Sequence, residues 1–143
     1  MSIHCYYEIN LHLVWHTKNS SLLLTPRIEP QAYHHLKKRV VETPGAFLHA
    51  IGGTATHVHL AVNIPPTLTI SDWIGALKGG SSHDVNEAAG ELAKVLQWQS
   101  GYGVVSFGTG DLDWVKAYIA NQKEHHHVGK IADRLERCIE LAP

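Results

Sequence analysis

The sequence predicts an α+β fold in which an antiparallel sheet carries helices packed on one side. Apolar and polar residues alternate over 6–18 and 57–64, which is the pattern of half-buried strands. Apolar residues recur at helical spacing between residues 28 and 43. The predicted order is strand, helix, strand, strand, helix, strand and then helices, which corresponds to the split βαβ or ferredoxin-like plan, also called RRM-like.

The sequence of the first half of the chain predicts three strands and one helix. Residues 6–18 form a central strand, with Leu11, Leu13 and Trp15 on one face and His12 and His16 on the other. A helix follows over 28–43 and ends at Thr43-Pro44-Gly45. Residues 46–52 form a strand, and the turn over 52–56 leads back into the strand at 57–64, which Pro65-Pro66 end.

The second half predicts mainly helices. Thr69 or Ser71 caps a helix that breaks or bends at Gly79-Gly80 and resumes to about residue 97. Residues 98–107 are expected to form a short strand, a turn and a second strand. After a flexible joint at 108–110, one helix spans about 111–128, and a last helix spans 131–141.

Composition limits the class of protein. The 143 residues, 44% of them hydrophobic and 17% charged, fit one domain over 1–143, because neither a repeat nor a shift in composition divides them. A net charge of -1 argues against a broad electrostatic grip on duplex DNA but leaves a local basic groove open. The start lacks a signal peptide and no apolar run reaches membrane length, so we expect a soluble cytoplasmic protein. Cys5 and Cys138 are expected to be reduced thiols, although pairing stays open.

Two pairs of residues could carry chemistry. Strand alternation puts His57 and His59 on one face, where both imidazoles can reach one divalent metal ion. Tyr118 and Gln122 are four apart and share a helix face. The metal would take His57, His59 and the Gln122 oxygen, and Tyr118 would attack phosphorus. The spacing alone also allows two plain sheet histidines, a packing tyrosine and a surface glutamine.

Five motifs, in order and at similar spacing over roughly residues 6–127, resemble the single-tyrosine HUH transposases of the IS200/IS605 type, including their REP-associated tyrosine transposase relatives. The motifs are Val14-Trp15-His16-Thr17-Lys18, His57-Val58-His59, Leu77-Lys78-Gly79-Gly80-Ser81-Ser82, Trp98-Gln99-Ser100-Gly101-Tyr102-Gly103, and Tyr118-Ile119-x-x-Gln122-x-x-His125-His126.

The resemblance implies an HUH palm with a C-terminal catalytic helix, and a DNA transposase that nicks and rejoins single-stranded DNA at hairpin-bearing ends. Tyr118 would form a 5'-phosphotyrosine link and leave a free 3'-hydroxyl, while His57, His59 and Gln122 hold Mg²⁺ or Mn²⁺. No nucleotide cofactor is needed, because the phosphotyrosine retains the bond energy. The resemblance also implies a homodimer whose active sites are completed in trans, and no membrane association.

The sequence departs from the family pattern at two places. Thr56 stands where related sequences commonly carry Asp, and Asn19-Ser20-Ser21 replaces a basic cluster. His125-His126-His127 is interpreted as the cationic end of a helix and is left out of the metal site. The candidates for contacts to the DNA backbone are Lys18, Lys78, Lys116 and Lys123.

Two alternative functions remain open at this stage. One is a host-adopted nickase that cuts chromosomal hairpins with the same chemistry. The other is a catalytically silent module that binds single-stranded DNA, with Trp73 or Tyr102 stacking on bases. A histidine-dependent phosphodiesterase is disfavoured because a second His-x-Thr or His-x-Ser motif is lacking.

Overall fold

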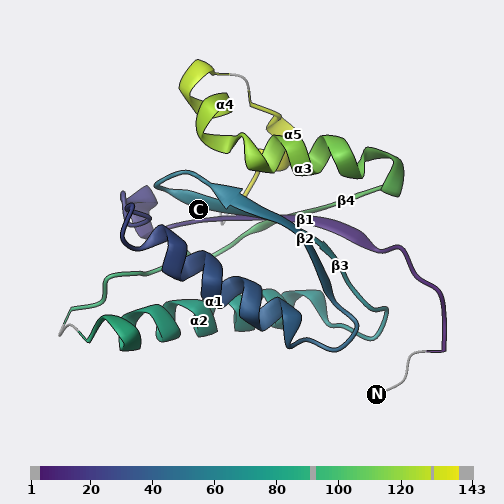
Figure 1. The fold of residues 1–143 in the computed structure, drawn as a ribbon, viewed down its shortest axis with the longest axis horizontal. Helices are drawn as coiled ribbons and strands as arrows, with labels where there is room; N and C mark the ends of the chain where they lie inside the picture. The colour runs from purple at the N-terminus through teal and green to yellow at the C-terminus, as the bar shows by residue number, and fades with distance from the viewer. Residues whose placement is uncertain (1–3, 91–92, 130, 139–143) are drawn as a thin grey trace, which may run out of the picture.

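The computed structural model describes residues 4–90, 93–129 and 131–138. These residues form a four-stranded antiparallel sheet in the order β2-β3-β1-β4, with β1 and β3 in the centre (Figure 1). The strands are β1 (Asn10–His16), β2 (Phe47–Gly53), β3 (His57–Asn63) and β4 (Gly103–Phe107). The predicted α+β class with an antiparallel sheet is confirmed.

Helices cover both faces of this sheet (Figure 1). On one face lie α1 (Glu29–Val41) and α2 (Ile70–Ala89), which are the helices predicted to pack on one side. The C-terminal helices α3 (Leu112–Ala120), α4 (Gln122–Val128) and α5 (Asp133–Glu136) lie on the opposite face. Short 3-10 turns precede α1 and α3, at Lys18–Ser20 and Thr109–Asp111. In the described ranges, no helix combines the length and apolar character needed to cross a membrane.

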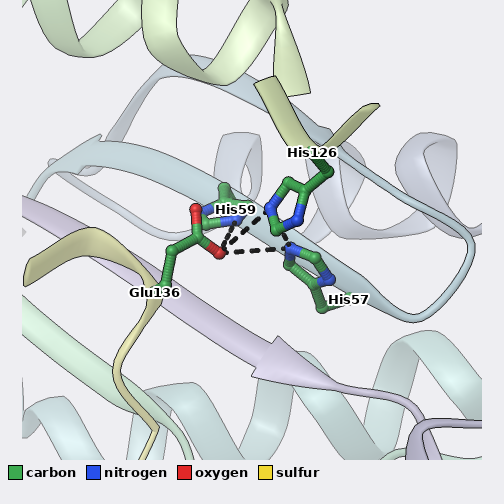
Figure 2. A group of neighbouring side chains, drawn as sticks. All are labelled: His57, His59, His126 and Glu136. Atoms are coloured by element: carbon green, nitrogen blue, oxygen red, sulfur yellow. Dashed lines mark hydrogen bonds and ion pairs between the residues drawn. The ribbon is translucent and has the colours of Figure 1, made fainter. Parts of the chain in front are cut away.

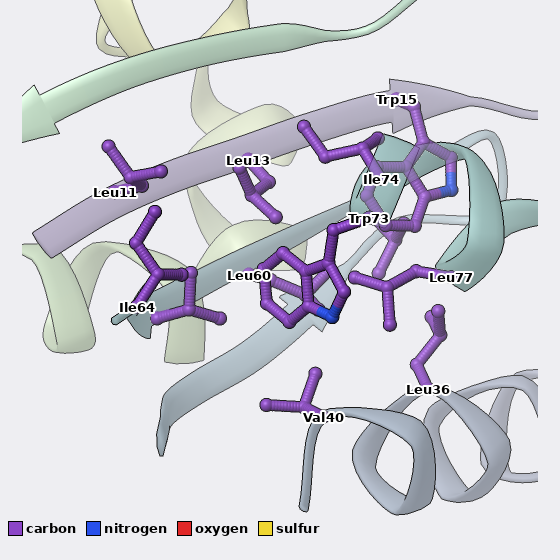
Figure 3. Close-up of a cluster of buried hydrophobic side chains, with 12 residues drawn as sticks. Leu11, Leu13, Trp15, Leu36, Val40, Leu60, Ile64, Trp73, Ile74 and Leu77 are labelled. Carbon is purple, nitrogen blue, oxygen red and sulfur yellow. The ribbon is translucent and has the colours of Figure 1, made fainter. Parts of the chain in front are cut away.

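The main hydrophobic core lies between the sheet and the α1–α2 layer (Figure 3). Alternation along β1 sends Leu11, Leu13 and Trp15 into this core, as predicted, and leaves His12 on the other face. Full burial of each large apolar side chain contributes about 1.5–3 kcal/mol. Trp73 is buried here too, and its indole nitrogen donates to the Thr43 hydroxyl at 2.9 Å.

The predicted break in the second helix is wrong, because α2 runs unbroken from Ile70 to Ala89 through both glycines. Arg39 of α1 donates to Asp84 at 3.0 and 3.2 Å and ties the two helices together beside this stretch. The extension to residue 97 is wrong as well. Gly90 ends the helix in the left-handed conformation. Beyond it, the Asn86 side chain forms hydrogen bonds with the backbone of Val95 and Leu96.

Three further boundaries differ from the prediction. The first strand is shorter than 6–18, and Trp98 forms only an isolated bridge with Thr17, so 98–107 contains one strand, β4. The single helix predicted over 111–128 is divided at Asn121, whose backbone angles of φ -105° and ψ 24° are not helical. The last helix is only α5, and part of the predicted span 131–141 lies outside the described residues.

Candidate functional site

The candidate site lies on the sheet face that carries α3, α4 and α5, where the strands present histidines. On β3, His57 and His59 point to this face and are 3% and 0% exposed. The antiparallel pairing sets His57 opposite His16 of β1, and their rings stack at 4.9 Å. Both imidazoles therefore lie on the same face of β3, as the strand alternation predicts.

Both imidazoles have one ring nitrogen held by a neighbour. Nδ1 of His59 lies 2.8 Å from Nε2 of His12, a fully buried residue whose pKa burial lowers to about 3. Nδ1 of His57 lies 2.9 Å from the Thr54 hydroxyl and 3.1 Å from the Thr56 hydroxyl. Such contacts fix the orientation of metal-binding histidines. They leave Nε2 of each ring free to face the C-terminal helices.

The helix that carries Tyr118 packs closely on the sheet because β2 has glycine at position 52. A Cβ added to Gly52 would lie 2.4 Å from the Ile119 carbonyl oxygen, so any larger residue would push α3 away. The Tyr118 ring stacks between Trp114, at 5.5 Å, and His125, at 4.8 Å. It also meets the His59 ring edge-on at 6.2 Å. The fold therefore brings Tyr118 to the histidine pair.

Gln122 begins α4 and is 1% exposed. Its Nε2 donates to the Tyr118 carbonyl at 3.3 Å, but its Oε1 has no hydrogen-bond partner among the residues that the structure describes. Leaving a buried acceptor unpaired costs about 1–3 kcal/mol. A buried amide oxygen without a partner is available to a cation, and the role of Gln122 as a metal ligand stays a prediction.

The site also contains His126 and Glu136, two residues that were not predicted from the sequence to belong to it (Figure 2). Oε1 of Glu136 lies 3.3 Å from Nε2 of His57, 3.2 Å from Nε2 of His59 and 3.3 Å from Nε2 of His126. Nε2 of His57 and His126 are 3.2 Å apart. Ligand atoms of all four residues lie within 4.8 Å of one another, a grouping that could hold a metal ion.

The Glu136 carboxylate also contacts the hydroxyl of Tyr118. That hydroxyl donates to Oε2 of Glu136, and the backbone N–H of Ala132 donates to the phenolic oxygen at 2.8 Å. Burial raises the pKa of Tyr118, and the bond to Glu136 raises it further. Burial would raise the pKa of Glu136 too, but its close contacts with the imidazoles of His57 and His59 outweigh burial and hold that pKa well below its usual range. One carboxylate thus joins the tyrosine to the histidines.

Of the four lysines predicted to contact DNA, two are engaged within the protein. Lys78 donates to the carbonyls of Gln99 and Gly101 at 2.7 and 2.8 Å, and Lys123 pairs with Glu29 at 2.9 Å. Lys116 is exposed, and Lys18 is exposed beside a cavity of about 530 Å³. Both cysteines are free thiols.

Comparison with known proteins identifies the family. Residues 5–122 match the family model described as "Transposase IS200 like", a segment that contains His57, His59, Tyr118 and Gln122 and ends before His126. The transposases for insertion sequence element IS200 of Salmonella typhimurium strain LT2 and of Salmonella typhi are each 28% identical over 131 residues. The match covers 83% of this chain and 85% of each relative.

Two solved structures have similar folds. A candidate transposase from Deinococcus radiodurans R1 has a TM-score of 0.67 and 25% identity, with 85% of this chain and 96% of that chain covered. A REP-associated tyrosine transposase bound to a REP hairpin has a TM-score of 0.60 and 20% identity, with 92% and 76% covered. The family match spans most of the sequence, and the fold agrees with it. The chain therefore belongs to the IS200-like transposase family and is a transposase.

Proposed function

We propose that this transposase nicks and rejoins single-stranded DNA at hairpin-bearing ends through a covalent bond between Tyr118 and a 5'-phosphate. One observation carries the proposal: the Tyr118 hydroxyl and the two buried imidazoles of His57 and His59 meet at a single carboxylate, that of Glu136. A nucleophile and a group of metal ligands gathered at one place are what metal-assisted phosphoryl transfer requires.

The cutting step balances without another reactant. The Tyr118 oxygen forms a bond to phosphorus, the bond from phosphorus to the 3'-oxygen breaks, and the phenolic proton is finally carried by the new 3'-hydroxyl. The phosphodiester energy stays in the phosphotyrosine, so a 3'-hydroxyl at a new junction can reverse the step. Because burial and Glu136 raise the pKa of Tyr118, this hydroxyl is protonated before DNA enters and must be released from Glu136 to react.

A divalent cation at the histidine pair, Mg²⁺ or Mn²⁺ as the sequence resemblance implies, would supply Lewis-acid polarisation of the scissile phosphate. His57 and His59 would hold it through Nε2, and Gln122 would offer its Oε1, which has no hydrogen-bond partner among the described residues. The α3 helix orients the tyrosine, and the rings of Trp114 and His125 hold the phenol between them.

Hairpin-bearing single strands are the proposed substrate. The support comes from the family and from the solved protein of similar fold that is bound to a REP hairpin. We also propose a homodimer in which the tyrosine helix of one subunit serves the histidines of the other. In the isolated chain α3 packs on its own β2 and β3, so the exchange requires a hinge. Gly108 precedes the turn Thr109–Asp111 that leads into α3, and Gly110 lies within that turn.

The test is covalent capture from a pool of single strands. The protein is incubated with Mn²⁺ and random DNA in which half of the molecules carry a hairpin, and DNA that stays attached to protein under denaturing conditions is sequenced. The proposal expects enrichment of hairpin-bearing strands joined at a 5'-phosphate. Capture of strands irrespective of hairpins would refute the substrate, and the absence of any covalent DNA would refute the chemistry.

A further inference from the structure

We propose that His57, His59, His126 and Glu136 together bind one transition-metal ion of the zinc type, in tetrahedral geometry, before DNA enters the site. Two of the four, His126 and Glu136, lie beyond the segment matched by the family model, which ends at residue 122. This site shares His57 and His59 with the proposed function, and it rests on that function in no other respect.

The spacing of the ligand atoms indicates the geometry. Around a tetrahedral Zn²⁺ with bonds of about 2.0–2.1 Å, neighbouring ligand atoms lie about 3.3 Å apart. Around an octahedral Mg²⁺ with bonds of similar length, they lie about 2.9–3.0 Å apart. The four measured separations are 3.2 Å for His57–His126, 3.2 Å for His59–Glu136, and 3.3 Å for His57–Glu136 and His126–Glu136. These four of the six separations are closer to the tetrahedral value than to the octahedral one.

The two remaining pairs are His59–His57 and His59–His126, and in each the two ligand atoms lie within 4.8 Å of each other. Closing both separations to about 3.3 Å, by at most about 1.5 Å each, would complete the tetrahedron. His59 is held from behind by His12, so its Nε2 already points to the position that the ion would take.

The chemistry of the ligands indicates the class of metal. Three imidazole nitrogens and one carboxylate oxygen suit Zn²⁺ and its transition-metal neighbours, whereas Mg²⁺ prefers oxygen ligands and retains water. A site with four protein ligands is also closed, leaving no position for a phosphate oxygen. His126 or Glu136 must therefore leave when DNA binds, and departure of Glu136 would free the Tyr118 hydroxyl.

The alternative is a network of hydrogen bonds that holds no metal. In such a network one of the facing Nε2 atoms of His57 and His126 donates to the other at 3.2 Å, and Glu136 is the partner of the remaining imidazole, His59, at 3.2 Å. Nε2 of His59 is buried and makes no hydrogen bond of good geometry within the described part of the chain. A shared cation satisfies all three nitrogens at once.

The test is calorimetric titration of the full chain with Zn²⁺ after treatment with a chelator, without DNA. We expect one site per chain that excess Mg²⁺ does not displace. His126→Ala and Glu136→Gln should each weaken Zn²⁺ binding by about tenfold or more, comparable to the loss of other groups that support a metal site. The matched controls are His127→Ala and Glu124→Ala, whose side chains are exposed and lie outside the cluster, and both should bind within twofold of the original chain.

Circular dichroism of every variant shows whether it folds, so that a loss of binding is not confused with unfolding. If folded His126→Ala and Glu136→Gln both bind Zn²⁺ as the original chain does, these residues are not ligands and the inference is wrong. Co²⁺ gives a second readout, because a four-coordinate site absorbs visible light intensely and an octahedral one weakly. A weak spectrum in the original chain would overturn the tetrahedral site. Strong Zn²⁺ binding by a chain that never attaches to DNA would instead refute only the proposed function.

Discussion

A single methyl group on β2 should separate metal binding from catalysis. Gly52→Ala places a Cβ at 2.4 Å from the Ile119 carbonyl oxygen, whereas ordinary contact of a Cβ begins at 3.4 Å. Backbone cannot rotate out of the way as a side chain can. The α3 helix must therefore recede from β2 by about 1 Å, the amount by which the contact is too short, and it carries Tyr118 with it.

The consequences differ for stability and for rate. Overpacking of this size typically costs about 1–3 kcal/mol of unfolding free energy. A reacting group misplaced by about 1 Å costs on the order of 100-fold in rate. Gly52 pairs with His59 across the β2–β3 ladder, but the atoms nearest to the added Cβ all belong to Ile119. Metal binding by the histidine pair should therefore be weakened less than DNA cleavage.

The measurements are urea denaturation, calorimetry with Mn²⁺ and single-turnover cleavage of hairpin DNA. Gly75→Ala is the matched control, because this exposed glycine of α2 has no atom within 4 Å of an added Cβ, and the change should stabilise the helix by about 0.5–1 kcal/mol. If Gly52→Ala cleaves DNA as fast as Gly75→Ala, the close packing of α3 on β2 does not position the nucleophile.

Three further outcomes follow from the fold and the site. The pKa of His12 is about 3 in the folded protein against 6.5 ordinarily, so the unfolded chain takes up the proton first. In the presence of a chelator, the free energy of unfolding should therefore fall as pH drops from 6.5 toward 3, by up to about 1.4 kcal/mol per pH unit. The fall should be shallower in His12→Leu. Equal slopes in the two proteins would mean that His12 is charged in the fold. Leu60→Ala removes a fully buried side chain from the main core and should cost about 2–5 kcal/mol in urea denaturation, whereas a cost under about 1 kcal/mol would contradict this core. Sedimentation at micromolar concentration should show a homodimer, and a monomer would rule out completion of the site in trans.

Strand periodicity predicts much of the fold because the face toward α1 and α2 is apolar, whereas the opposite face carries the histidines, although β1 and β3 are buried on both faces. The alternation of Leu11, Leu13 and Trp15 with His12 holds in β1, and the turn of glycines and threonines after β2 correctly leads to the histidine strand. The ends of α2 could not be predicted in this way. The Arg39–Asp84 pair beside the glycines joins residues 45 apart in sequence, and at the end of the helix the Asn86 side chain binds the backbone of Leu96, ten residues ahead; neither contact leaves a periodic signal in the sequence.

The candidate site shows the same division. His57, His59, Tyr118 and Gln122 stand at regular strand and helix spacings, and the fold brings the tyrosine to the histidines. Glu136 has no local signal, because its position depends on the C-terminal segment crossing the sheet at Gly103, where an added Cβ would lie 1.7 Å from the Arg137 carbonyl oxygen. His126 belongs to a run of three histidines that follows the interruption at Asn121, so regular helix spacing from Tyr118 does not indicate which of them reaches Glu136.

The central claim is that Tyr118 is the nucleophile, and the most direct measurement of it is the covalent adduct. Hairpin DNA labelled on the 5'-phosphate side of the cut is incubated with the original chain, with Tyr118→Phe and with Tyr102→Phe, and each reaction is run on a denaturing gel. Phenylalanine keeps the ring stacked between Trp114 and His125 and loses only the bonds to Glu136 and Ala132, at a cost of about 1–3 kcal/mol, so Tyr118→Phe should still fold and bind DNA. We expect a protein-linked band for the original chain and for Tyr102→Phe, and none for Tyr118→Phe. A linked band from Tyr118→Phe, or cleavage by the original chain without any linked band, would contradict this expectation, the latter because water activated by the metal would then be the attacking group.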